Sequence, residues 1–169
     1  MSGAPAAFLD RDGVLIEDCG YPHKPEHLVL IPGAAEAVRR LKSLGYLTVI
    51  VTNQSGVARG LFTEDQMHDF NALLIERLAQ NGGVIDAVYA APYHADAVIE
   101  RYRHPDHPDR KPNPGMLLRA IEEHGIDPSK SLMIGDQPTD VEAARRAGVT
   151  GHLFKGDNLD AFVQSLPTG

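Results

Sequence analysis

Short apolar runs alternate with amphipathic segments along most of this 169-residue chain. The apolar runs have the length and side chains of buried strands, and they cover residues 6–10, 46–52, 85–91, 131–136 and 150–154. The segments between them carry helical spacing or helix end signals, at residues 33–44, 63–78, 114–125 and 139–147. This alternation predicts a parallel sheet with right-handed crossovers and helices on both faces. We therefore expect one doubly wound α/β domain spanning residues 1–169.

The segment at residues 63–78 has the most explicit helix signals. Thr63 and Gln66 have the spacing of a capping box, which predicts a helix that begins directly after Thr63. The predicted buried stripe of this helix consists of Met67, Phe70, Leu74 and Leu78.

Polar residues stand where three of the predicted strands end. Asp10, Thr52 and Asp136 each close an apolar run. In open parallel sheets the ligand crevice lies outside the carboxyl ends of the strands. We therefore expect these three side chains to converge at one edge of the sheet.

Each of these polar segments also has a plain structural interpretation. Residues 10–13 can be an acid-rich turn, and residues 51–56 can be a turn after a strand. Residues 135–140 can be a helix start whose acidic residue favours the positive end of the helix dipole. Arg110 and Lys111 can be solvated surface. Their order, and their shared placement at one end of the predicted sheet, favour a functional site.

Four segments, FLDRDGV, VTNQSG, RKP and IGDQPTD, together resemble the motifs of the haloacid dehalogenase superfamily across nearly the whole chain. Within it, TNQSGVARGLFTE and RKPNPGML are similar to the branch of heptose-bisphosphate and histidinol-phosphate phosphatases. The resemblance implies a Rossmann-like sheet without a separate cap domain. It also implies a Mg²⁺-dependent phosphomonoesterase for a small sugar (bis)phosphate, foremost D-glycero-D-manno-heptose 1,7-bisphosphate. The alternatives are a phosphatase for histidinol phosphate or another small monoester, and a non-catalytic binding module on the same fold.

The same resemblance implies roles for individual residues. Asp10 would be the nucleophile that forms an aspartyl-phosphate, and Asp12 the general acid and base. Mg²⁺ would bind Asp10, the backbone carbonyl of Asp12, Asp136 and waters. The phosphoryl group would be held by Thr52, Asn53 and Lys111, with Asp140 in support. Substrate contacts would come from Asp18, Gly20, Tyr21, Gln54, Ser55 and Arg110, although residues 18–21 can also be a plain turn.

The chain departs from this branch in the segment before Arg110. Many relatives tie that loop with zinc through a Cys-x-His and a Cys-x-Cys pair, whereas this chain has Ala91, Tyr93, His107 and Asp109 at those positions. Candidate ligands remain at His94, His104, His107 and Asp109. Structural zinc sites usually rely on thiolates, so we expect a loop without structural zinc. Gln137 stands where a lysine is often found, which leaves its substrate contacts open.

Charge and composition narrow the set of partners. A net charge of −7 argues against nucleic acid, because phosphate backbones bind clustered cations. The single cysteine, Cys19, fits a reducing compartment. The apolar runs are far shorter than the roughly 20 residues that span a bilayer. We expect a cytoplasmic monomer that acts on a small sugar phosphate and has neither a nucleic acid nor a membrane partner.

Overall fold

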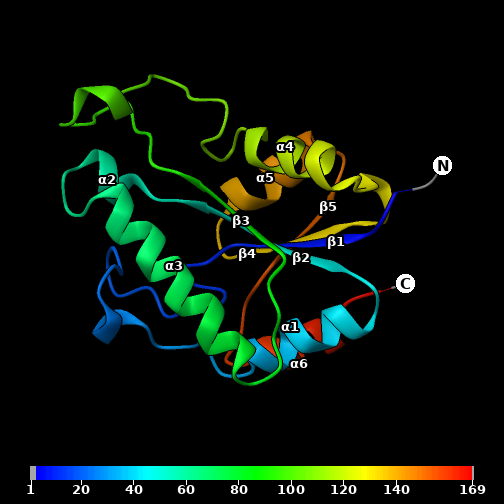
Figure 1. The fold of residues 1–169 in the computed structure, drawn as a ribbon. Helices are drawn as coiled ribbons and strands as arrows, with labels where there is room; N and C mark the ends of the chain where they lie inside the picture. The colour runs from blue at the N-terminus through cyan, green and yellow to red at the C-terminus, as the bar shows by residue number, and fades with distance from the viewer. Residues whose placement is uncertain (1–2, 169) are drawn as a thin grey trace.

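The computed structural model describes residues 3–168 and contains a five-stranded parallel sheet with the order β3-β2-β1-β4-β5 (Figure 1). The strands are β1 (Ala6–Leu9), β2 (Leu47–Asn53), β3 (Ala87–Ala91), β4 (Leu132–Gly135) and β5 (Thr150–Leu153). All four neighbouring pairs are parallel. The chain moves outward from β1 to β3 and then returns to the other side of β1, so the order reverses between β1 and β4. This confirms the predicted doubly wound α/β sheet, and the reversal is where such sheets bind ligands.

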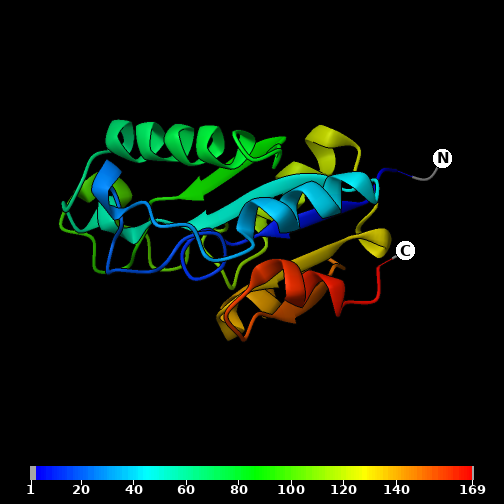
Figure 2. The same ribbon diagram turned by 90° about the horizontal axis from the view of Figure 1, so that it is seen from below.

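Helices cover both faces of the sheet. They are α1 (Ala34–Ser43), α2 (Ser55–Ala58), α3 (Glu64–Ala79), α4 (Gly115–His124), α5 (Pro138–Arg146) and α6 (Leu159–Gln164). Short 3₁₀ helices occupy η1 (Pro25–His27), η2 (Glu100–Tyr102) and η3 (Pro128–Lys130). Helices α1, α3 and α6 lie over one face, and α4 and α5 lie over the other (Figures 1 and 2).

Alternation along β1 divides the hydrophobic core into two layers. Ala7 and Leu9 pack with the side chains of α1, α3 and α6. Ala6 and Phe8 point to the other face and pack with α4 and α5. Because both faces of β1 are covered, all four of its residues are fully buried. The strand is thereby a rigid support for Asp10, which follows it directly.

The predicted helix signals largely match the structure. Thr63 accepts a hydrogen bond from the N–H of Gln66, and the Gln66 side chain accepts one from the N–H of Thr63. The predicted stripe of this helix is buried at Met67, Phe70, Leu74 and Leu78. The helix predicted to start at residue 114 begins one residue later, and α5 begins at Pro138 instead of Thr139. Helix α2 and the 3₁₀ helices were not predicted, because three or four residues are too few to show a periodic pattern.

The segment between β3 and α4 is irregular apart from η2, as its composition predicts. Its histidines organise the backbone: the Nδ1 atoms of His94, His104 and His107 each accept, at 3.0 Å, the N–H of the residue two positions later. The His107 ring also stacks on Tyr93 with a centroid separation of 3.5 Å. A loop without zinc stays a prediction. Across the described part of the chain, no helix has the length and apolar character needed to cross a membrane.

Candidate active site

The strands β1, β2 and β4 deliver their polar residues to one cavity of about 170 Å³ at the carboxyl end of the sheet. The predicted convergence of Asp10, Thr52 and Asp136 is therefore confirmed. The lining consists of Asp10, Asp12, Asp18, Thr52, Asn53, Lys111, Asp136, Gln137, Thr139 and Asp140. A cavity of about 500 Å³ at the opposite end of the sheet includes Lys130 and His152 but has no carboxylate in its lining. The smaller cavity, which carries the carboxylates and Lys111, is therefore the candidate active site.

Lys111 is the cation at the centre of this cavity and is only 3% exposed. Its Nζ donates to Asp10 Oδ1 at 2.9 Å, to Asp140 Oδ1 at 2.6 Å and to the carbonyl of Val51 at 2.9 Å. Burial alone would lower the pKa of Lys111, but the carboxylates of Asp10 and Asp140 raise it above its ordinary value. The ammonium therefore stays charged beside Asp10, and it can donate to a bound anion by releasing one of these three acceptors.

Asn53 fixes the backbone that carries Lys111. Its Oδ1 accepts from the N–H of Lys111 at 3.0 Å, and its Nδ2 donates to the carbonyl of Lys111 at 3.1 Å. The amide group is thus used within the protein at both ends. Asn53 lines the cavity as expected, and its side chain holds the backbone at Lys111 in place.

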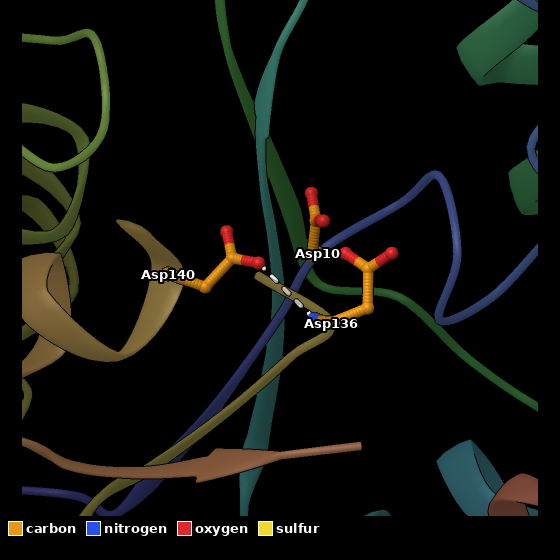
Figure 3. Close-up of side chains that lie close together, drawn as sticks. All are labelled: Asp10, Asp136 and Asp140. Carbon is orange, nitrogen blue, oxygen red and sulfur yellow. Dashed lines mark hydrogen bonds between the residues drawn. The ribbon is translucent and has the colours of Figure 1, made fainter. Parts of the chain in front are cut away.

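Three carboxylates crowd the floor of the cavity. Asp10, Asp136 and Asp140 offer oxygens that all lie within 4.8 Å of one another (Figure 3). Asp140 is fully engaged: Oδ1 accepts from Lys111, and Oδ2 accepts from the backbone N–H groups of Asp136 and Gln137 at 3.1 Å each. It therefore positions Lys111 and the start of α5, in agreement with the supporting role expected for it.

Asp10 and Asp136 retain oxygens that can take a cation. Asp136 Oδ1 is buried without a hydrogen-bond partner among residues 3–168. Gly13 lets the Asp136 carboxylate approach closely: its φ is +89°, and a Cβ at this position would collide with Asp136 Oδ2. Clustered carboxylate oxygens are the donors preferred by a hard divalent cation such as Mg²⁺. The residues present therefore fit such an ion.

The pKa values of Asp10 and Asp136 are both shifted by this crowding. Burial raises the pKa of Asp10 to about 8; the nearby Asp140 and Asp12 also raise it, while Lys111 lowers it. Burial also raises the pKa of Asp136. The single positive charge of Lys111 therefore does not balance the negative charges of the carboxylates in the cavity. A divalent cation at Asp10 and Asp136 would lower both pKa values and keep Asp10 ionised near neutral pH.

Asp12 lines the cavity from the turn after β1. Its carboxylate is held by the neighbouring Arg11, whose Nε donates to Asp12 Oδ1 at 2.6 Å. Arg11 is completely buried, and sequence reasoning did not find it. The only signal in the sequence was its position between two aspartates directly after a buried strand.

Gln54 and Ser55, two of the expected substrate contacts, lie at the start of α2. Gln54 is 3% exposed; its Oε1 accepts from Arg11 and its Nε2 donates to Thr52 Oγ1 at 2.8 Å. Both ends of the Gln54 amide are therefore used inside the protein, where Gln54 supports Thr52; a contact between Gln54 and substrate stays a prediction. Ser55 is the first residue of α2 and is partly buried.

The turn at residues 18–21 lies at the rim. Asp18 lines the cavity and accepts from the N–H of Gly20 at 3.0 Å. Gly20 and Tyr21 both have left-handed backbone conformations, with φ of 84° and 55°. The guanidinium of Arg59 lies over the partly exposed Tyr21 ring, 6.0 Å from the ring centroid.

Arg59 and Arg110 form an uncompensated pair of cations beside Tyr21. Arg110 Nη1 donates to the carbonyl of Tyr93 at 3.3 Å, and Arg59 Nη2 lies 3.4 Å from His94 Nε2. Burial and the charge of Arg59 lower the pKa of Arg110. Among the described residues neither arginine pairs with a carboxylate. Arg59 stands within the segment TNQSGVARGLFTE, but sequence reasoning gave it no role; it directly follows the unpredicted helix α2.

The sequence matches a known family over most of its length. The family described as haloacid dehalogenase-like hydrolase matches residues 8–148. A D-glycero-beta-D-manno-heptose-1,7-bisphosphate 7-phosphatase from Rhodopseudomonas palustris is 42% identical over 163 residues, which are 96% of this chain and 89% of that protein. A D-glycero-D-manno-heptose-1,7-bisphosphate 7-phosphatase from Thermosynechococcus vestitus is 46% identical over 155 residues, covering 89% and 79%.

Two solved phosphatase structures are similar to this chain in both fold and sequence. A HAD-like phosphatase from Mesorhizobium loti superposes with a TM-score of 0.86 at 41% identity, covering 90% of this chain and 73% of its own. The D,D-heptose 1,7-bisphosphate phosphatase from B. bronchiseptica, complexed with magnesium and phosphate, superposes with a TM-score of 0.79. It is 30% identical and covers 96% of this chain and 88% of its own.

Proposed function

The chain belongs to the haloacid dehalogenase-like hydrolases, and from this premise we propose that it is a magnesium-dependent phosphatase that removes the 7-phosphate of D-glycero-D-manno-heptose 1,7-bisphosphate. The main support for this proposal is the buried Lys111 ammonium, which donates to both Asp10 and Asp140. It places a fixed positive charge beside a carboxylate that has free lone pairs. The names of the curated relatives support the choice of substrate.

In the first step Asp10 attacks the phosphorus atom and displaces the sugar oxygen. The bond between phosphorus and that oxygen breaks as the bond to Asp10 forms, which divides one difficult displacement into two easier ones. Asp12 gives its proton to the departing oxygen. Lys111 and the hydroxyl of Thr52 bind the phosphoryl oxygens where negative charge increases in the transition state.

In the second step water attacks the phosphorus atom of the aspartyl-phosphate. Asp12, now ionised, takes a proton from that water, and the carboxylate of Asp10 leaves. Inorganic phosphate is released, and both aspartates return to their initial protonation states. A single carboxyl group serves in both steps, a role that typically contributes 10²- to 10⁴-fold in rate.

Asp10, Asp136 and the backbone carbonyl of Asp12 would hold the Mg²⁺ ion. The unpartnered Oδ1 of Asp136 and the oxygens crowded around Asp10 support this placement. The ion would act as a Lewis acid and offset the negative charge of the carboxylates and the phosphate. Asp140 already accepts three hydrogen bonds, which supports a role outside the metal ligands.

We assign the second phosphate of the substrate to Arg59 and Arg110. Both guanidinium groups lack a carboxylate partner among the described residues, and Tyr21 borders them on the side of the turn at residues 18–21. A bidentate cation beside Lys111 suits a doubly phosphorylated sugar better than a single phosphate.

Steady-state kinetics with Mg²⁺ test the substrate. We expect a higher kcat/KM for the heptose bisphosphate than for histidinol phosphate, and release of one phosphate only, as followed by ³¹P NMR. Arg59→Met and Arg110→Met should each lower kcat/KM for the bisphosphate by about 10- to 100-fold, which corresponds to a charged hydrogen bond of about 1.5–3 kcal/mol.

Turnover of a substrate with one phosphate should be nearly unchanged in these two variants. Arg40→Met is the matched control, because Arg40 pairs with Asp160 on the far helices α1 and α6. A higher kcat/KM for histidinol phosphate, or an equal loss on both substrate types, would overturn the assignment.

A further inference from the structure

Arg11 is a buried cation whose polar contacts reach four parts of the molecule. It is 0% exposed, and its Nε and Nη2 atoms lie 2.6 and 3.3 Å from the two oxygens of Asp12. Nη1 donates to Asn71 Oδ1 on α3 at 2.9 Å, and Nη2 donates to the carbonyl of Pro22 and to Gln54 Oε1 at 3.1 Å each. Such a network is costly to build, because a buried guanidinium needs nearly all its donors satisfied.

The two-point contact restrains the direction of the Asp12 carboxylate. The guanidinium is itself immobilised, since the ring of Phe70 lies under it at 4.8 Å and Asn71 holds its far end. Rotation of the Asp12 side chain would break the 2.6 Å charge-assisted hydrogen bond from Nε and the longer contact from Nη2. Among the described residues Arg11 pairs with no other carboxylate. The shorter contact, from Nε to Asp12 Oδ1, can persist while Oδ2 carries the proton that general acid catalysis requires.

A second branch of the network controls the hydroxyl of Thr52. Arg11 can only donate, so the group of Gln54 that faces it must be the amide oxygen. The amide nitrogen of Gln54 is thereby turned toward Thr52 Oγ1 and donates to it at 2.8 Å. A hydroxyl that accepts this bond keeps its own proton to donate. The alternative acceptor inside the protein, the carbonyl of Asn53, is 3.4 Å away.

We propose that Arg11 is a positioning residue that aims two groups at the cavity, the Asp12 carboxylate directly and the Thr52 hydroxyl proton through Gln54. The inference deepens the proposed phosphatase mechanism and rests on it. Arg11 does not touch the substrate; it fixes the geometry in which Asp12 reaches the leaving oxygen and Thr52 reaches a phosphoryl oxygen. Small errors in this geometry strongly lower the rate of general acid catalysis.

Leaving-group dependence separates positioning from simple structural support. A sugar alkoxide must be protonated as it departs, whereas p-nitrophenolate departs without a proton. In Arg11→Lys the rate of aspartyl-phosphate formation, measured by rapid acid quench with Mg²⁺, should fall about tenfold or more for the sugar phosphate relative to p-nitrophenyl phosphate. Arg40→Lys is the matched control and should leave both rates unchanged.

Two further variants keep the test decisive if Arg11→Lys does not fold. Asn71→Leu removes a hydrogen-bond acceptor of the guanidinium on α3, outside the cavity. It should lower the rate of aspartyl-phosphate formation from the sugar phosphate relative to p-nitrophenyl phosphate, by a smaller factor than Arg11→Lys. Gln54→Met removes the donor to Thr52 and one acceptor of Arg11 Nη2, but it leaves the contacts of Arg11 with Asp12 and Asn71 in place, so it should slow phosphoryl transfer from both substrates by a similar factor. Melting temperatures and circular dichroism establish that each variant is folded.

Equal losses on the two substrates in both Arg11→Lys and Asn71→Leu, or no loss in either, would overturn the inference. A wild-type protein that forms no aspartyl-phosphate from either substrate would instead refute the underlying mechanism. The two failures are therefore distinguishable.

Discussion

Removal of the Lys111 ammonium is the sharpest test of the electrostatics in the cavity. Lys111→Met keeps most of the side-chain volume but leaves Asp10 and Asp140 without their shared cation, at positions where all three residues are less than a tenth exposed. Breaking a buried ion pair by removing one partner costs about 3–5 kcal/mol. This is a large part of the 5–15 kcal/mol that stabilises a typical domain. We expect a folded but strongly destabilised protein.

The penalty should grow with pH. In wild-type protein without metal, burial holds the pKa of Asp10 near 8, so at pH 6 Asp10 is protonated in the folded state of both proteins. Loss of Lys111 removes the group that lowers this pKa, so at pH 9 the folded variant binds more protons than the folded wild type. By linkage, the difference in unfolding free energy then increases with pH. We expect the penalty to be at least about 1 kcal/mol larger at pH 9, since one pKa unit corresponds to about 1.4 kcal/mol.

Urea unfolding followed by far-UV circular dichroism measures this penalty, because the chain has no tryptophan for fluorescence. The measurements are made in EDTA at pH 6 and pH 9. Lys42→Met is the matched control: Lys42 pairs with Asp86 at 2.7 Å, but both side chains are over a quarter exposed. That variant should lose less than about 1 kcal/mol. A Lys111→Met penalty as small as the control's, or one that does not change with pH, would refute the reasoning.

Three further predictions concern the metal and the loop before Arg110. Gly13→Ala places a methyl group against the Asp136 carboxylate, so we expect Mg²⁺ affinity measured by calorimetry to fall at least about tenfold; unchanged affinity contradicts the crowding argument. EDTA should abolish turnover and added Mg²⁺ should restore it, and indifference to chelation would remove the ion from the mechanism. Elemental analysis should find no stoichiometric zinc; the opposite result is dialysis-resistant zinc that is lost on His104→Ala or His107→Ala.

The sequence predicts the placement of Asp10, Thr52 and Asp136 because each stands at the carboxyl end of a buried apolar run. Strand ends in a parallel sheet have a fixed common edge, so the strand positions determine where these side chains meet. The stripe and cap of α3 were predictable for a similar reason, since helical spacing fixes which residues share a face.

The orientation of side chains in irregular segments was not predictable in this way. Asn53 ends β2 and Gln54 follows it, in a polar stretch that suggests ligand contacts, yet both amides bond within the protein. No periodicity fixes where such side chains point. Arg11 was missed because arginine is rarely buried, and its partners come from positions 1, 11, 43 and 60 residues away. Only the three-dimensional structure brings those partners together.

Covalent phosphorylation of Asp10 is the central claim, and rapid acid quench during turnover of the heptose bisphosphate with Mg²⁺ tests it directly. Peptide mass spectrometry of the quenched protein locates the phosphoryl group. We predict that it is found on the peptide containing Asp10, and that a folded Asp10→Asn variant carries no label and does not turn over. A phosphoryl group on another residue, or an Asp10→Asn variant that retains more than about a tenth of the wild-type rate, would contradict covalent catalysis by Asp10.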